Sequence, residues 1–261
     1  MKIACVGDNC VDYYDATGEA HPGGNAVNVA VYTRRLGGDS SYTGAVGTDR
    51  NGRLMLEALR GKGVDVSRVQ VLPGATALTH VSLVNGERVF GGYEEGVLQN
   101  FRLSDADIDF LCGHDLVVSG LWGMVEKELG KIRARGVSVA FDCATRPDDE
   151  AALVALPSCD VAFFSDDEAN DEALCGRVRA VAARGPRIVV ATRGEKGSLA
   201  WDGKTFTPFG IVACPVVDTM GAGDSYIAGF LNEWLRGSDI LSCMGAGAVC
   251  SAVTLGVPGA W

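Results

Sequence analysis

The sequence has few of the features that mark metal-binding, disulfide-rich or nucleic-acid-binding proteins. Only three of its 261 residues are histidine, and its nine cysteines include no Cys-x-x-Cys pair. This pattern suits buried, reduced thiols better than a zinc site or a disulfide framework. The 23 lysines and arginines are scattered and leave a formal net charge of −10. Nucleic-acid partners are therefore not expected, because they require clustered basic side chains.

Long apolar runs are also missing. The apolar segment at residues 1–6 stops at Gly7 and Asp8, which is too short for a signal peptide. No other run approaches the roughly 20 residues that a membrane-spanning helix needs. We therefore expect a cytoplasmic protein without a membrane partner.

What the chain does have is enough apolar sequence for a large core, since 47% of its residues are hydrophobic. Strand-like and helix-like segments alternate from residue 104 onward. The expected strands are 115–119, 137–141, 159–164 and 187–191, and the expected helices are 104–112, 125–135, 148–156 and 167–184. Such alternation predicts an α/β domain whose parallel sheet is covered on both faces. No repeat or linker divides the chain, so residues 1–261 are expected to form one domain.

The most informative stretch is the run of small residues Gly221-Ala222-Gly223, followed by Asp224. It joins the apolar segment 211–217, predicted to be a strand, to an amphipathic helix that ends near Gly237. Backbone amides at such a helix start can bind an anion, and an adjacent carboxylate can take a proton from a hydroxyl group. The alternative is an ordinary glycine-rich helix start with a favourable acidic residue in its first turn.

Two further polar clusters follow the same logic. Asp8 and Asp12 come after the first predicted strand, at the sheet edge where ligands bind in α/β proteins, although aspartate is also common in turns. Gly23-Gly24-Asn25 opens a second helix that also carries Asn28. The glycines allow close approach of a ligand, and the amide side chains can bind hydroxyls, although Asn25 could instead cap the helix.

The segment DTMGAGDSYIAGF at 218–230 and the run from Gly23 to Gly52 resemble, in that order, the two signatures of the ribokinase-like, or PfkB, carbohydrate kinases. The resemblance implies a three-layer α/β/α fold with a central, mostly parallel sheet. It also implies a small β-sheet lid over a sugar site, formed by about residues 11–21 and 76–95. In the alternative, the hairpin at Asn85-Gly86 completes the edge of the main sheet.

The resemblance further implies ATP-dependent phosphorylation of a sugar, with magnesium bound to the nucleotide. Asp224 would be the catalytic base, and the amides of Gly221, Ala222 and Gly223 would stabilise the transferred phosphoryl group. The residues expected to bind the sugar are Asp8, Asp12, Gly23, Gly24, Asn25, Asn28 and Arg88.

On the nucleotide side, the resemblance points to Thr192, Gly194 and Gly197. Glu168 would organise magnesium through water, although Ser165 stands where the family has asparagine. Asp218 lies where family members often bind a monovalent cation, so potassium is possible. Lids of this family often pair, so a homodimer is possible as well.

Five segments, 7–12, 23–32, 88–91, 95–97 and 259–261, are similar to members that phosphorylate the primary 6-hydroxyl of a fructose joined to a lysine amine. Glu94 and Glu95 could meet the ammonium group of such a substrate. The alternatives are a ribokinase or fructokinase type of substrate, or a binding regulator without catalysis, against which the intact Asp224 counts. For Asp142, after another strand, the sequence favours a structural role.

Overall fold

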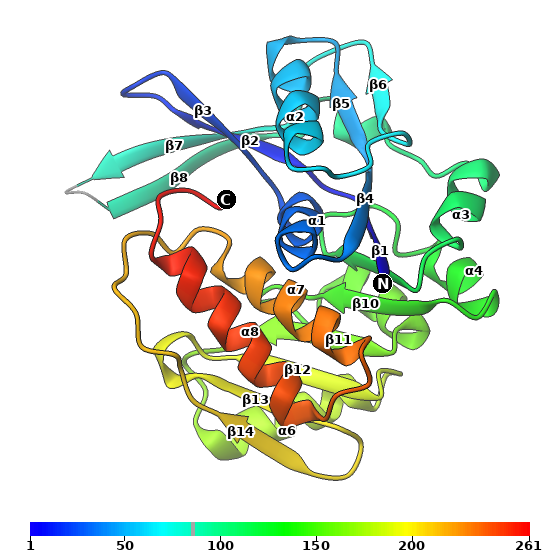
Figure 1. The fold of residues 1–261 in the computed structure, drawn as a ribbon, viewed down its shortest axis with the longest axis vertical. Helices are drawn as coiled ribbons and strands as arrows, with labels where there is room; N and C mark the ends of the chain where they lie inside the picture. Colours follow the sequence, from blue (N-terminus) through cyan, green and yellow to red (C-terminus); the bar gives the residue numbers. More distant parts are fainter. Residues whose placement is uncertain (85–86) are drawn as a thin grey trace.

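The structure is a computed structural model that describes residues 1–84 and 87–261, with the backbone alone for 83–84 and 87–90. An eight-stranded sheet forms its centre, in the order β14-β13-β12-β11-β10-β9-β1-β4 (Figure 1). All neighbours are parallel except β12–β13 and β13–β14. The strands are β1 (Lys2–Val6), β4 (Asp39–Thr43), β9 (Leu116–Gly120), β10 (Ser138–Asp142), β11 (Val161–Ser165), β12 (Ile188–Thr192), β13 (Ser198–Trp201) and β14 (Phe206–Phe209).

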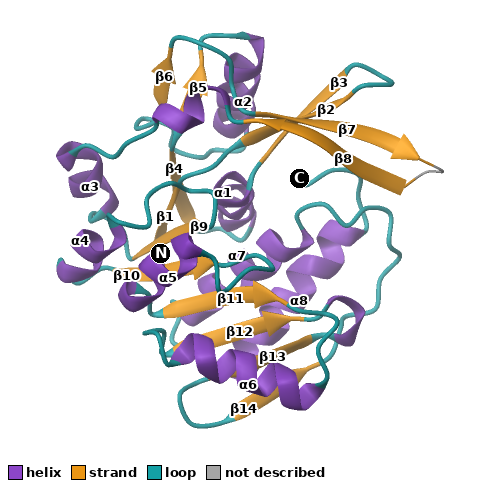
Figure 2. Ribbon diagram, turned by 180° about the vertical axis from the view of Figure 1, so that it is seen from behind, coloured by secondary structure: helices purple, strands orange, loops and turns teal. Residues whose placement is uncertain are grey.

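Helices cover both faces of this sheet. Those on the face toward the viewer in Figure 1 are α1 (Asn25–Arg35), α7 (Ala222–Trp234) and α8 (Ile240–Leu255). Those on the opposite face, seen in Figure 2, are α3 (Asp105–Leu111), α4 (Leu129–Ala134), α5 (Glu150–Ala155) and α6 (Asp171–Ala182). The short 3-10 helices are η1 (Gly96–Asn100), η2 (Leu156–Ser158) and η3 (Gly194–Lys196).

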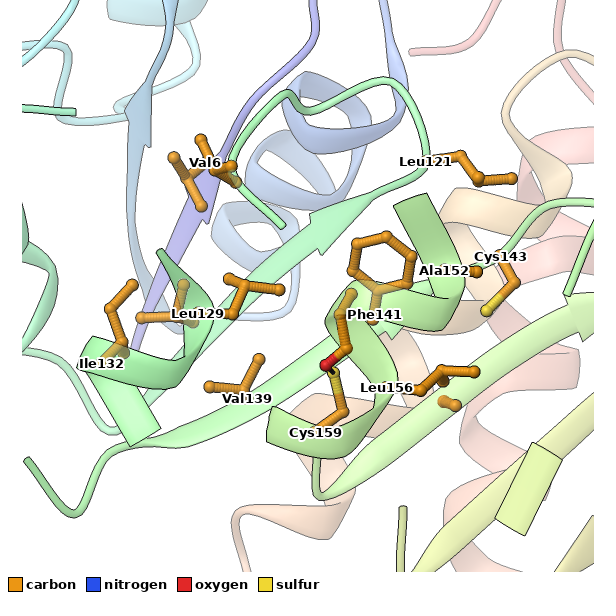
Figure 3. Close-up of a cluster of buried hydrophobic side chains, with 14 of the residues drawn as sticks. Val6, Leu121, Leu129, Ile132, Val139, Phe141, Cys143, Ala152, Leu156 and Cys159 are labelled. Atoms are coloured by element: carbon orange, nitrogen blue, oxygen red, sulfur yellow. Dashed lines mark hydrogen bonds between the residues drawn. The ribbon is translucent and has the colours of Figure 1, made fainter. Parts of the chain in front are cut away.

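Alternate residues of the parallel strands enter two separate cores. In β1, Ala4 and Val6 join the core under α3 to α6 (Figure 3), whereas Ile3 and Cys5 join the core under α1, α7 and α8. Successive side chains of a strand point to opposite faces, so a strand buried on both faces is apolar throughout. The predicted three-layer α/β/α fold is confirmed.

A separate four-stranded sheet, in the order β3-β2-β7-β8, projects from one end of the molecule (Figure 1). Its strands are β2 (Cys10–Tyr14), β3 (Glu19–Gly23), β7 (Leu78–Val84) and β8 (Glu87–Glu94). The predicted small lid sheet is therefore present, and the alternative of a hairpin at the edge of the main sheet is wrong. The predicted turn at Asn85-Gly86 lies outside the described residues. Beside the lid, α2 (Arg50–Gly61) packs near a two-stranded sheet of β5 (Ala45–Gly47) and β6 (Gln70–Leu72).

Two predicted helices begin four residues later than expected. The predicted start of α6 at residue 167 is wrong because Asn170 is the N-cap, and its side-chain oxygen accepts from the amide of Ala173. Asp166 instead accepts from the amide of Ala169 and pairs with Arg177, closing a turn before the helix. The segment 125–128 likewise forms turns before α4 begins at Leu129.

The apolar segment 211–217 is not a strand, so the predicted strand leading into the glycine motif is wrong. It forms part of the long loop that leaves β14 and crosses to α7 (Figure 1). Ile211, Val216 and Val217 are each more than half exposed, at 57%, 65% and 59%. Their β-branched side chains resemble a strand in sequence, but no neighbouring strand pairs with them in the described part of the chain. No helix of that part is long and apolar enough to cross a membrane.

Candidate active site

The polar residues meet at the carboxyl edge of the central sheet, beside the point where the strand order reverses. Strand β1 pairs with β4 on one side and with β9, which comes later in the chain, on the other side. Asp8 follows β1, and Asp142 ends β10. Open α/β sheets bind ligands in the crevice at such a point.

Asp224, in the first turn of α7, is held by two amide side chains from α1. Asn25 Nδ2 donates to Asp224 Oδ1 at 2.7 Å, and Asn28 Nδ2 donates to Asp224 Oδ2 at 2.6 Å. The two asparagines lie three residues apart, so they share one face of α1. The alternative that Asn25 caps α1 is wrong, because Gly24 holds the N-cap position. Both oxygens of Asp224 are therefore fixed in orientation.

Two more carboxylates converge on Asn25. Asp8 Oδ2 accepts from the backbone amide of Asn25 at 3.0 Å, and Asp142 Oδ2 accepts from its Nδ2 at 2.8 Å. Asp142, for which the sequence favoured a structural role, therefore lies in the cluster. Its position at the end of a predicted parallel strand was the signal that could have identified it.

Burial and the negative charge of Asp224 raise the tendency of Asp8 and Asp142 to hold a proton. Burial, with the negative charge of Asp224, raises the pKa of Asp142 to about 7. Burial also raises the pKa of Asp8 to about 6, against the opposing effect of the Asn25 amide, and raises the pKa of Asp224 against the two asparagine side chains. Within the described residues no ion pair neutralises these groups. The cluster therefore favours a nearby proton or cation.

The paired glycines have different roles beside this cluster, because Gly24 packs tightly against a backbone and Gly23 leaves room. Gly24 has φ 110°, and a side chain there would come within 2.7 Å of the Cα atom of Asn9. A methyl group on Gly23 would lie 3.5 Å from Asp12 Oδ2 and 3.9 Å from Asn28 Oδ1, so these residues face one space. The side chain of Arg88, the remaining predicted sugar-binding residue, lies outside those described.

Some buried acceptors near this space have no hydrogen-bond partner among the described residues. They include Asp8 Oδ1 and Asn25 Oδ1. Buried polar atoms are normally paired, so each of these two oxygens can take a further hydrogen-bond donor.

Trp261 contributes to the site although the residue patterns did not point to it. Its indole Nε1 donates to Asn28 Oδ1 at 2.7 Å. Tyr32 of α1 holds the same segment by donating to the carbonyl of Ala260 at 2.5 Å, and Thr254 donates to Tyr32 at 2.7 Å. The indole thus fixes which end of the Asn28 amide faces Asp224. The only sequence signal for this residue was the resemblance at 259–261.

A cavity of about 650 Å³ lies on the other side of Asp224. The predicted nucleotide residues Thr192, Gly194 and Gly197 line it, as do Ala222 and Gly223 of the glycine motif. The exposed loop 210–214 and small residues of α8 complete a largely apolar wall. The small residues of α8 are Ala248, Ser251 and Ala252. Gly221 adopts a left-handed conformation with φ 71°, which only glycine adopts readily, and turns the chain into α7.

Magnesium has no complete protein cage here, since the described residues contain no group of three or more candidate ligands. Such an arrangement fits an ion held mainly by nucleotide phosphates and water. Asp167 lines the cavity, while the neighbouring Glu168 is exposed and does not line it. Arg193 pairs with Asp171 at 2.9 Å and so joins the cavity loop to α6.

Asp218 joins two loops beside the cavity. It accepts from the backbone amides of Met220 at 3.0 Å and Gly259 at 2.5 Å. It therefore ties the approach to α7 to the segment that carries Trp261.

Comparisons with known proteins show the family of the chain. The sequence model of the family described as "pfkB family carbohydrate kinase" matches residues 2–261. The chain is 42% identical over 259 residues to fructoselysine 6-kinase of Shigella flexneri, covering 99% of each chain. It is 36% identical over 266 residues to fructosamine kinase FrlD of Bacillus subtilis, covering all of this chain and 93% of the relative.

Among solved structures, Arabidopsis thaliana ribokinase complexed with ribose and ATP superimposes with a TM-score of 0.90 at 23% identity, covering 99% of this chain and 93% of that one. Xylella fastidiosa fructokinase with bound ATP gives a TM-score of 0.86 at 21% identity, covering 99% and 93%. The chain belongs to the pfkB family of carbohydrate kinases and is an ATP-dependent sugar kinase.

Proposed function

We propose that this kinase transfers the γ-phosphate of ATP to the primary 6-hydroxyl of fructoselysine or a similar fructosamine, which is a fructose joined to an amine. The observation that carries the proposal is Asp224, held by two asparagine side chains beside a cavity of about 650 Å³, with unpaired acceptors on the neighbouring Asp8 and Asn25. The relatives named for fructoselysine and fructosamine, at 42% and 36% identity over nearly the whole chain, support the choice of substrate.

Asp224 accepts the proton of the attacking hydroxyl as the oxygen–phosphorus bond forms. Asn25 and Asn28 hold its two oxygens, so the carboxylate does not need to reorient. Burial raises its pKa, which makes it a stronger base than an exposed aspartate. Positioning and electrostatics supply most of the rate in phosphoryl transfer, so this fixed geometry is the chain's main contribution.

The start of α7 receives the phosphoryl group. Helix-start amides at Gly221, Ala222 and Gly223 face a bound anion with the positive end of the helix dipole behind them. The amide of Ala222 makes only a long turn bond of 3.3 Å to the carbonyl of Thr219. Magnesium, when bound, neutralises charge on the β- and γ-phosphates. We assign its protein contacts to Asp167 and, through water, Glu168.

The sugar lies on the lid side of Asp224. Asp8 Oδ1 and Asn25 Oδ1 accept from its hydroxyls, while Asp12 and Asn28 face the space that Gly23 leaves open. Gly24 keeps the backbone close to the ring, and Arg88 on β8 completes the set from the lid. A second copy of the chain pairing through the lid is also part of the proposal, and sedimentation analysis would report a dimer.

A coupled ADP-release assay with magnesium-ATP tests the proposal. The panel contains fructoselysine, fructose and ribose at equal concentrations. We expect the highest kcat/KM with fructoselysine. A preference for ribose or fructose would make the chain a kinase of those sugars, and tight sugar binding without turnover would make it a binding regulator. Parallel assays in potassium and sodium salts test the cation role of Asp218, for which we expect faster turnover in potassium.

A further inference from the structure

In a fructosamine, the 6-hydroxyl that is phosphorylated and the carbon that carries the amine lie at opposite ends of the sugar. If the 6-hydroxyl faces Asp224 and the nucleotide cavity, the amine must leave in the opposite direction. The nucleotide cavity lies over the ends of β11 and β12, since Ser165 and Thr192 line it. The amine therefore leaves toward β9, β1 and the base of the lid. This inference rests on the proposed function.

A second cavity, of about 580 Å³, lies at that end of the site. Its wall starts next to the carboxylate cluster, because the amide of Leu121, which lines it, donates to the carbonyl of Asp142 at 3.1 Å. Figure 3 shows Leu121 where the chain leaves β9. The same loop touches the first strand end, since a methyl group on Gly7 would lie only 2.4 Å from the Cα atom of Gly123.

The end of the lid also borders the second cavity. Glu95, which lines the second cavity, follows β8 directly and lies two residues from Tyr93. Partial burial, reinforced by the charges of Cys10, Asp8 and Glu95, raises the pKa of Tyr93.

The lining of the second cavity is chemically mixed. Leu103, Leu121, Met124 and Ala151 supply apolar surface. Trp122 adds an aromatic ring, whose face carries the guanidinium of Arg146 at 5.7 Å. Ligand sites commonly combine an apolar wall of this kind with a few polar groups, in cavities of roughly 300–1,000 Å³.

Charges of both signs stand around this apolar wall. Glu95 and Glu126 make no ion pair among the described residues, whereas the third acid, Glu128, is paired with Lys131 at 2.5 Å. On the basic side are Arg102 and Lys127. Arg102 Nη1 donates to the carbonyls of Gln99 and Phe101, and its other guanidinium nitrogens have no side-chain or backbone acceptor among the residues the structure describes.

We propose that this second cavity binds the amino-acid arm of the substrate. Its apolar wall and Trp122 contact the aliphatic stem, Glu95 and Glu126 bind the ammonium groups, and Lys127 with Arg102 binds the carboxylate. The chemical class assigned is therefore a fructosamine whose amine carries a zwitterionic amino acid.

The lid offers a matched pair of acids for the test. Glu95 lines the cavity, whereas the adjacent Glu94 lies 3.7 Å from His80. We compare wild type, Glu95→Gln, Glu126→Gln and the control Glu94→Gln. The readout is the ratio of kcat/KM for fructoselysine to that for fructose.

We expect Glu95→Gln and Glu126→Gln each to lower this ratio about fivefold to tenfold, because each removes a charge-assisted hydrogen bond at a partly exposed site. Glu94→Gln should keep the wild-type ratio. A fructosamine made with butylamine, which lacks the terminal zwitterion, should lose little of its kcat/KM in Glu126→Gln. Equal thermal melting of all four proteins shows that they are folded alike.

Two outcomes separate this inference from the proposed function. A wild-type enzyme that prefers fructoselysine, with variants that keep the same preference, leaves the function standing and overturns the cavity assignment. A wild-type enzyme that phosphorylates fructose but not fructoselysine overturns both.

Discussion

Replacing Asp224 by asparagine should stop catalysis while leaving the fold and the binding sites nearly intact. The two side chains have the same shape, but the amide cannot accept the proton of the attacking hydroxyl. Positioned general bases contribute about 10²–10⁴-fold to rate, so we expect kcat to fall by at least about 100-fold. The KM values for sugar and ATP should change little.

The same substitution has two opposing effects on stability. The new amide group meets the donors of Asn25 and Asn28, so one hydrogen bond is lost, at a cost of about 1 kcal/mol. Removing the negative charge also relieves repulsion with Asp142 and Asp8, whose pKa values the Asp224 charge raises. The two effects oppose each other, so the melting temperature should stay within a few degrees of the wild-type value.

The ADP-release assay and thermal melting check both parts of this prediction. Asp142→Asn is the matched control, because it removes a carboxylate from the same cluster but leaves Asp224 and its two amides in place. It should lower kcat far less than Asp224→Asn. Near-normal turnover in Asp224→Asn would refute the assignment of the base, and equal losses in both variants would refute the distinction between base and neighbour.

Three further outcomes follow from the site. Gly24→Ala should lower the free energy of unfolding in urea by about 1–3 kcal/mol, because its φ of 110° and a backbone carbon 2.7 Å away leave no room for a methyl group; an unchanged unfolding curve would contradict this. The free protein should be more stable at pH 5.5 than at pH 8. The pKa values of Asp8 and Asp142 rise from 3.8 to about 6 and about 7 on folding, so the folded state binds more protons in that window, and stability is lost as pH rises through it; equal unfolding free energies at the two pH values would count against the buried cluster. Trp261→Phe should raise the KM for the sugar about threefold to tenfold with the KM for ATP unchanged, because Asn28 loses the donor that orients its amide; an unchanged sugar KM would remove Trp261 from the site.

Much of this fold could be predicted because its signals are local. Strands buried on both faces read as apolar runs, as in β1, and Ser104 forms the capping box that starts α3. The glycine motif before Asp224 also has a local physical meaning at a helix start. These patterns located the layers, and the family resemblance added the lid; the role of Asp224 as the base stays a prediction.

The errors came from features that depend on distant contacts. The segment 211–217 has the composition of a strand, but no strand in the described part of the chain pairs with it, and it borders the cavity of about 650 Å³ instead. Asp142 and Trp261 reach Asn25 and Asn28 across 117 and 233 residues of sequence, and no local pattern encodes such a pairing. Asn170, not Asp166 or Asp167, starts α6, because several adjacent residues could each cap a helix.

The position of phosphorylation tests the central claim most directly. Fructoselysine is incubated with magnesium-ATP and the enzyme, and phosphorus–proton correlation NMR identifies the carbon that carries the new phosphate. The account predicts a single product with phosphate on the primary 6-hydroxyl. Phosphate on any other hydroxyl, or no phosphorylated product from an enzyme that turns over another sugar, would contradict it.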